Sequence, residues 1–192
     1  LVDRVDVSHY RLSIHLLIAF IILTLILWNY LKINIKQTSI DKIKYNLPLL
    51  FLLLIYIQIV IGAFVSGMDA GKIYNSWPLM GNNYFPDDNA IVDLFKLTAF
   101  DSPSLVQFIH RNLAYVILLF FLIILFDVYK NKLASFYLPV NIVGFLLFLQ
   151  IFLGIITLLY GAQILVSSMH QISSIFLVTS CVYLLYINKK FS

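Results

Sequence analysis

Charged residues and cysteine are scarce in this sequence. Of the 192 residues only 11% are charged, the nine acidic residues are all aspartate, and Cys181 is the single cysteine. Soluble domains carry about twice this share of charged residues, so the composition excludes an ordinary soluble protein. One cysteine excludes a disulfide within the chain and a zinc site built on a cysteine pair. The sequence also lacks a phosphate-cradling glycine-rich loop and any pair of carboxylates within an apolar stretch, which excludes the familiar hydrolase sites.

Long apolar stretches dominate what is present. Hydrophobic residues make up 61% of the chain, and the mean hydropathy is +0.95. A helix needs about 20 mostly apolar residues to cross the hydrocarbon of a bilayer. Five stretches meet this requirement: Leu12–Leu31, Leu47–Val65, Leu105–Phe126, Leu138–Tyr160 and Ile164–Ile187. The sequence therefore predicts an all-α fold, a polytopic bundle of five transmembrane helices in a lipid bilayer.

The charges between these stretches predict the orientation of the bundle. Lysines gather in segments 32–46, 130–132 and 189–190, which alternation of the spans places on one side of the membrane. That side is cytoplasmic, or the matrix in a mitochondrion, because basic residues are retained there. The outer loop 66–104 carries five aspartates and two lysines. Since the net charge of +4 comes from short loops, we expect no nucleic-acid partner.

Three of the four histidines fall at one depth below the outer helix ends. His15, His110 and His170 lie within the first two turns of stretches that descend from the outer side, roughly 5–9 Å down at 1.5 Å per residue. Polar groups at such positions are costly and usually paired or functional, and neutral imidazole is a good iron ligand. A small residue follows each histidine one turn later on the same face, leaving room for a flat macrocycle: Ala19, Ala114 and Ser174.

This pattern predicts a six-coordinate haem held between two histidines of different helices. A proton relay and a non-haem metal site are the alternatives, and each histidine alone is also explained by a hydrogen bond to a carbonyl or water. His9 lies just outside the first stretch and is expected to be a surface residue. Arg111 has two equal interpretations: it neutralises a haem propionate, or it extends to the lipid headgroups.

A short motif occurs twice. Gln58 and Gly62 near the end of the second stretch have the same spacing as Gln150 and Gly154 in the fourth. Because small residues allow helices to approach closely, we interpret this repeat first as a packing device.

Four segments in order resemble the haem A synthases. They are residues 1–4 with 8–15 (LVDR and SHYRLSIH), 62–81 (GAFVSGMDAGKIYNSWPLMG), 107–111 (QFIHR) and 170–171 (HQ). The similarity covers nearly the whole chain and is closest to the branch found in mitochondria and many proteobacteria. The segment from Asp69 to Ser76 is the most specific of these.

The resemblance implies a fold of eight helices in two halves, of which this chain holds the last five. Residues 1–46 would be the last helix of the N-terminal, substrate-binding half with a cytoplasmic loop, and residues 47–192 the C-terminal four-helix half. His110 and His170 would be the axial ligands of a b-type haem, and His15 would bind the iron of the substrate, haem O. The Asp69–Gly81 segment is expected to cover this layer as a lid.

The implied reaction oxidises a methyl group of haem O to a formyl group by successive hydroxylations, which gives haem A for cytochrome oxidase. The implied partners are haem O synthase and cytochrome oxidase assembly factors; a homo-oligomer is left open. The chain starts without Met, so we expect it to be a fragment, inactive alone, with the catalytic acid upstream. We favour a bacterial inner membrane over the mitochondrial one, because Lys, Ile and Asn are abundant and Arg is rare.

Two other functions are compatible with the histidines. A bis-histidine b-type cytochrome serving as an electron-transfer membrane subunit needs His110 and His170 only, so His15 argues against it. A transporter or assembly factor would use the same histidines for protons or metal, and would carry no haem. The chemistry of methyl oxidation comes from the resemblance alone, because a fold or a spacing does not define a reaction.

Overall fold

A computed structural model describes residues 8–35 and 41–189 of the chain. The described part is helical and contains five long helices: α1 (His9–Asn34), α2 (Leu47–Gly67), α3 (Pro103–Lys130), α4 (Tyr137–Leu159) and α5 (Ile164–Asn188). Short 3-10 turns lie between them: η1 (Lys44–Asn46), η2 (Ala70–Lys72), η3 (Ile91–Phe95), η4 (Leu97–Asp101) and η5 (Ala134–Phe136).

All five helices are long and apolar enough to span a membrane. Each contains one of the stretches expected from hydropathy, which confirms the predicted all-α membrane bundle; only Tyr160 falls just past the end of α4. Proline stands at the start of α2 and α3, where a missing N–H breaks no helical hydrogen bond. Residues 1–4 of the first motif, together with Lys36 and Lys190, lie outside the described residues.

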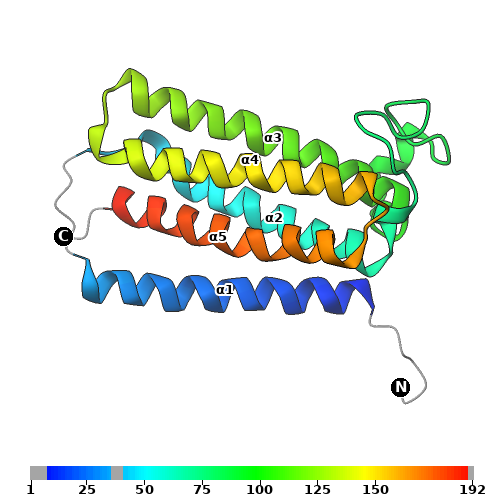
Figure 1. Cartoon of the computed structure of the whole chain (residues 1–192), viewed down its shortest axis with the longest axis horizontal. Coiled ribbons are helices and arrows are strands. Elements are labelled where there is room, and N and C mark those ends of the chain that lie inside the picture. Colours follow the sequence, from blue (N-terminus) through cyan, green and yellow to red (C-terminus); the bar gives the residue numbers. More distant parts are fainter. Residues whose placement is uncertain (1–7, 36–40, 190–192) are drawn as a thin grey trace, which may run out of the picture.

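The helices α2 to α5 form a four-membered bundle. Helix α2 packs against both α3 and α5, and α4 also packs against both, so α3 and α5 face each other across the bundle. Figure 1 shows this arrangement, with α4 in front of α2 and with α3 and α5 on opposite sides. Helix α1 lies along the outside of the bundle and packs against α2 and α5.

Lys44, Lys130 and Lys189 lie at one end of the bundle, which we call the basic end. The main apolar core lies toward this end and does not extend to the end that carries the outer loop. The largest fully buried side chains, Phe51 and Phe136, lie near the starts of α2 and α4. A second, small buried cluster of Ile61, Phe64 and Val106 lies near the outer loop. The three histidines at matched depth are six or seven residues inside α1, α3 and α5, about 9–10 Å from the helix starts.

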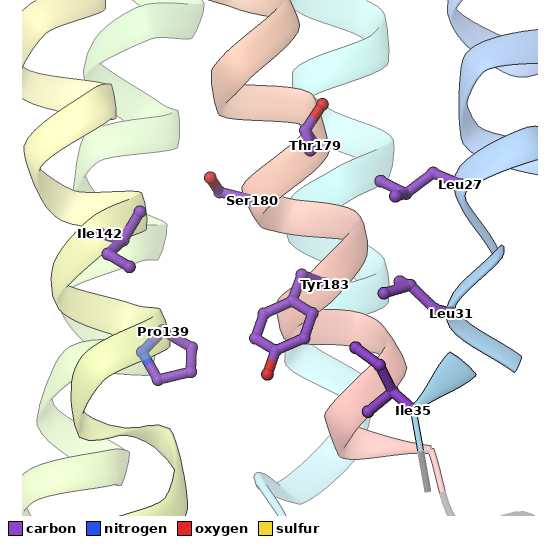
Figure 2. Close-up of a pocket in the computed structure, with 8 residues that line it drawn as sticks. All are labelled: Leu27, Leu31, Ile35, Pro139, Ile142, Thr179, Ser180 and Tyr183. Carbon is purple, nitrogen blue, oxygen red and sulfur yellow. The ribbon is translucent and has the colours of Figure 1, made fainter. Parts of the chain in front are cut away.

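An apolar groove opens at the basic end, between α1, α4 and α5. It has a volume of about 310 Å³, and its lining includes Leu27, Leu31 and Ile142 together with the hydroxyl-bearing Thr179, Ser180 and Tyr183. Figure 2 shows these side chains converging from the three helices. The histidine layer is at the opposite end of the helices, so this groove takes no part in the histidine site.

Candidate functional site

His110 lies in a niche formed by the neighbouring helix α2. The side-chain amide of Gln58 donates a hydrogen bond to the backbone carbonyl of His110 at 3.0 Å, and its Nε2 also lies 3.4 Å from His110 Nε2. Gly62 lies one turn further along α2. A Cβ atom there would stand 3.1 Å from His110 Cε1, closer than ordinary van der Waals contact. The glycine therefore provides the space that the imidazole occupies.

His170 has the same surroundings on helix α4. The amide of Gln150 donates to the backbone carbonyl of His170 at 2.9 Å. A Cβ at Gly154 would again stand 3.1 Å from the imidazole Cε1. Each copy of the repeated Gln–Gly motif thus supports one histidine. The glycine allows close approach, as expected of a packing device, and the group that approaches it is an imidazole ring.

The two imidazoles share one further property. In the part of the chain that the structure describes, the Nδ1 atoms of both His110 and His170 are buried and have no hydrogen-bond partner. The two rings are also near enough to act on each other electrostatically. A buried imidazole nitrogen without a partner is costly, and coordination of a metal is one way to offset that cost. Two imidazoles on the facing helices α3 and α5 are a donor set that could hold a haem.

His15 lies apart from this pair. It is exposed on α1, on the face turned away from the buried residues Ser13 and Phe20. Its predicted neighbour at the next turn, Ala19, is exposed on the same face. The structure therefore brings His110 and His170 together and places His15 at the same depth on a different surface.

Arg111 is bound to the outer loop. Its guanidinium donates to three backbone carbonyls: Tyr74 at 2.9 Å, Ser76 at 2.9 Å and Leu79 at 3.2 Å. The two interpretations drawn from the sequence, a propionate partner and a headgroup anchor, did not include this role, because residues 74–79 precede Arg111 by more than 30 positions in the chain. The Nε–H group is buried and has no partner among the described residues.

Further side chains of α3 hold the same loop. The amide of Gln107 donates to the carbonyl of Tyr74 at 3.2 Å, and the indole of Trp77 donates to the hydroxyl of Tyr115 at 3.0 Å. Asn75 of the loop donates to the carbonyl of Leu158 at 2.9 Å, near the end of the neighbouring helix α4. The segment expected to form a lid is therefore tied to two helices, to the first turns of α3 and to the end of α4.

Acidic residues stabilise the outer part of this loop. The hydroxyl of Tyr74 donates to Asp87 at 2.5 Å, and this hydrogen bond raises the pKa of Tyr74 to about 12. Partial burial raises the pKa of Asp88, but hydrogen bonds from Ser104 and Asn89 lower it by more, so its net pKa lies below the usual value. Ser104 is in the first turn of α3, so the loop is fixed to the start of the histidine helix.

His9 is not the simple surface residue that we expected. Its side chain is 22% exposed, packs against Phe64 and lies 3.6 Å from a carboxylate oxygen of Asp101. Tyr10 donates to the same carboxylate at 2.8 Å. These contacts fix the start of α1 to the end of η4, just before α3, and to the end of α2.

Nearly the whole chain matches a known family of proteins. The model of the cytochrome oxidase assembly protein family (COX15-CtaA) matches residues 1–182. The chain belongs to this family. The match includes all five helices almost to the end of α5, and it confirms the family expected from the motifs.

Individual members of the family are similar over nearly all of the chain. The heme A synthase of Pelagibacter ubique is 49% identical over 189 residues, 98% of this chain and 55% of that protein. The heme A synthases of Wolbachia pipientis wMel and Flavobacterium johnsoniae are 41% and 35% identical over 99% and 97% of the chain. The chain spans about half the length of these relatives. These family members are bacterial, and with the five spans they place the protein among multi-pass bacterial membrane proteins. No solved structure matches the chain.

Proposed function

We propose that the chain is the C-terminal, haem-holding part of a heme A synthase, with residues 1–46 completing the substrate half and residues 47–192 forming the second half. Its relatives carry that name and are similar from end to end of the chain. The observation within the chain that supports the proposal most is the matched environment of His110 and His170, each with a buried Nδ1 that lacks a partner.

The donor set favours a haem over other metal sites. Among the residues that the structure describes, no three His, Cys, Asp or Glu side chains lie close enough together to hold a metal ion. A structural zinc site needs four protein ligands and a catalytic one three, whereas a haem already supplies four nitrogens and needs one or two. Two histidines from facing helices therefore suit a b-type haem, which supplies a route for electrons when bound.

His15 would bind the substrate, haem O, in this proposal. An ionisable side chain on an apolar helix face at this depth is costly in lipid and marks a functional site. Its face of α1 is not covered by α2 or α5, so the substrate would lie on the outside of the four-helix bundle described here. The residues of the chain would thus bind two haems in one layer, one resident and one to be oxidised at a methyl group.

The outer loop would cover the haem layer on its outer side. Gln107 and Arg111 on α3 fix it directly beside His110. A loop held there would keep water from the outer side away from the haem layer, and the cation of Arg111 would still be near enough for a propionate to compete for it. The remaining partners, haem O synthase and assembly factors, are proposed from the family alone.

The experiment that tests this function uses the full-length protein in membranes that also make haem O. Haems are extracted and separated, and the formyl product is identified by its mass. We expect haem A with the wild type and none with His15→Ala, while the resident haem is retained. If the wild type yields only haem O beside a normal b-type spectrum, the proposal is wrong and the electron-transfer cytochrome replaces it.

A further inference from the structure

The bundle contains the same support twice, at equivalent places. We name Gln58 with Gly62 the α2 cradle, and Gln150 with Gly154 the α4 cradle. In each cradle the glutamine amide donates to the carbonyl of the supported histidine, at 3.0 and 2.9 Å. In each, the glycine leaves room for the imidazole edge, at a distance of 3.1 Å from an added Cβ.

The two groups of a cradle fix different degrees of freedom. The backbone carbonyl of each supported histidine already accepts the N–H of the residue four positions later in its own helix. The additional hydrogen bond from the glutamine amide therefore fixes how far the two helices are shifted along each other. The glycine sets how closely the ring lies against the neighbouring backbone. An added Cβ atom at this position requires the ring to move by a few tenths of an ångström. Together they set the position and tilt of a ring that would coordinate iron.

The cradles differ in how firmly the glutamine is held. The hydroxyl of Ser173 on α5 has two acceptors within hydrogen-bond distance, the Oε1 atom of Gln150 and, at 2.9 Å, the backbone carbonyl of His170. The corresponding position on α3, three residues after His110, is Leu113, which has no hydroxyl. In the described residues Gln58 Oε1 is buried and lacks a partner. The amide of the α4 cradle is therefore bonded on both sides, and that of the α2 cradle on one.

We propose that the two cradles are positioning elements for the axial histidines of the haem, and that the Ser173 hydroxyl makes the α4 cradle the more rigid of the two. The inference rests on the haem site of the proposed function. Partners behind a metal ligand fix its orientation, and their loss typically lowers metal affinity about 10–100-fold. The cradle residues do not touch the iron; they act through the histidines.

The glycines allow a test with a matched control. Gly62→Ala and Gly154→Ala are compared in the full-length, haem-loaded protein with Gly144→Ala, whose added Cβ would meet Phe121 at 2.8 Å in the apolar core. The readouts are the low-spin EPR signal of the ferric haem and the rate of haem transfer to a scavenger protein. We expect both cradle variants to shift the EPR signal and to lose haem about 10–100-fold faster. Gly144→Ala should lower thermal stability and change neither.

A milder variant tests the difference between the cradles without a steric clash. Ser173→Ala should speed haem loss about fivefold, the factor expected from one hydrogen bond. Thr179→Ala removes a hydroxyl that bonds only within α5, and should leave the rate unchanged. If Ser173→Ala behaves like Thr179→Ala, the claim about rigidity is overturned. If Gly62→Ala and Gly154→Ala leave the EPR signal and the rate of haem loss unchanged, as Gly144→Ala should, the positioning role is overturned. The haem site of the proposed function would not be affected by that result. A wild type without haem overturns both proposals together.

Discussion

Removing the guanidinium of Arg111 should release the outer loop from the histidine helix. The three hydrogen bonds that Arg111 donates all go to backbone carbonyls of this loop, within residues 74–79. Among the described residues, no other side chain of α3 makes as many hydrogen bonds with residues 74–79. Arg111→Ala therefore tests whether the loop is held by the helix or merely rests on it.

The size of the effect follows from the contacts. A hydrogen bond from a charged donor contributes about 1.5–3 kcal/mol, and two of the three are partly buried. The two partly buried hydrogen bonds together contribute about 3–6 kcal/mol. This range is an upper one, because carbonyls at the outer surface bind water once the guanidinium is removed. The lower end, about 3 kcal/mol, corresponds to roughly a 100-fold larger open fraction of the loop.

Hydrogen exchange measured by mass spectrometry in detergent or nanodiscs reports this open fraction. The amides to follow are those of Met80, which donates to the carbonyl of Asn83 at 2.7 Å, and Gly81, which donates to the hydroxyl of Ser76 at 3.0 Å. We expect about 100-fold faster exchange in Arg111→Ala, as estimated above. Exchange in α4 should stay unchanged and serves as the internal control.

Arg111→Lys separates geometry from charge. A lysine keeps the positive charge but presents a compact ammonium in place of the planar fork. It cannot reach three carbonyls at once, so exchange should fall between wild type and Arg111→Ala. Wild-type exchange in Arg111→Ala would show that the three hydrogen bonds do not hold the loop, and the reasoning would fail.

Three further perturbations test other contacts. Gly67→Ala places a Cβ 2.9 Å from backbone at the start of α1, so it should destabilise the protein by about 1–3 kcal/mol in thermal unfolding. Asn188→Leu leaves the buried N–H of Ile43 without its 2.7 Å acceptor and should cost about 1–3 kcal/mol. Asp87→Asn should lower the pKa of Tyr74 from about 12 toward 10. In the wild type the contribution of this hydrogen bond is complete below pH 10 and is lost as the pH rises toward 12, which a tyrosinate absorbance titration measures.

The helices could be predicted from the sequence because each depends on local composition. A stretch such as Leu138–Tyr160 is apolar throughout, so it spans a membrane whatever its neighbours are. The depth of the histidines followed from counting residues from the helix starts. These features need no knowledge of which helix packs against which.

The surroundings of the histidines could not be predicted in the same way. The repeat of Gln58 and Gln150 is visible in the sequence, but its role depends on α2 lying beside α3 and α4 beside α5. Likewise, the role of Arg111 depends on the path of a loop of almost forty residues that is neither apolar nor periodic. Both are long-range contacts, and no local pattern specifies them.

The pairing of His110 and His170 around one haem is tested most directly by spectroscopy of the purified full-length protein. The wild type should show the absorption and EPR signals of a low-spin haem with two imidazole ligands. His110→Ala and His170→Ala should each abolish these signals, because each removes one axial ligand, while His15→Ala should leave them intact. An unchanged low-spin spectrum in both variants would contradict the assignment of this pair as the haem ligands.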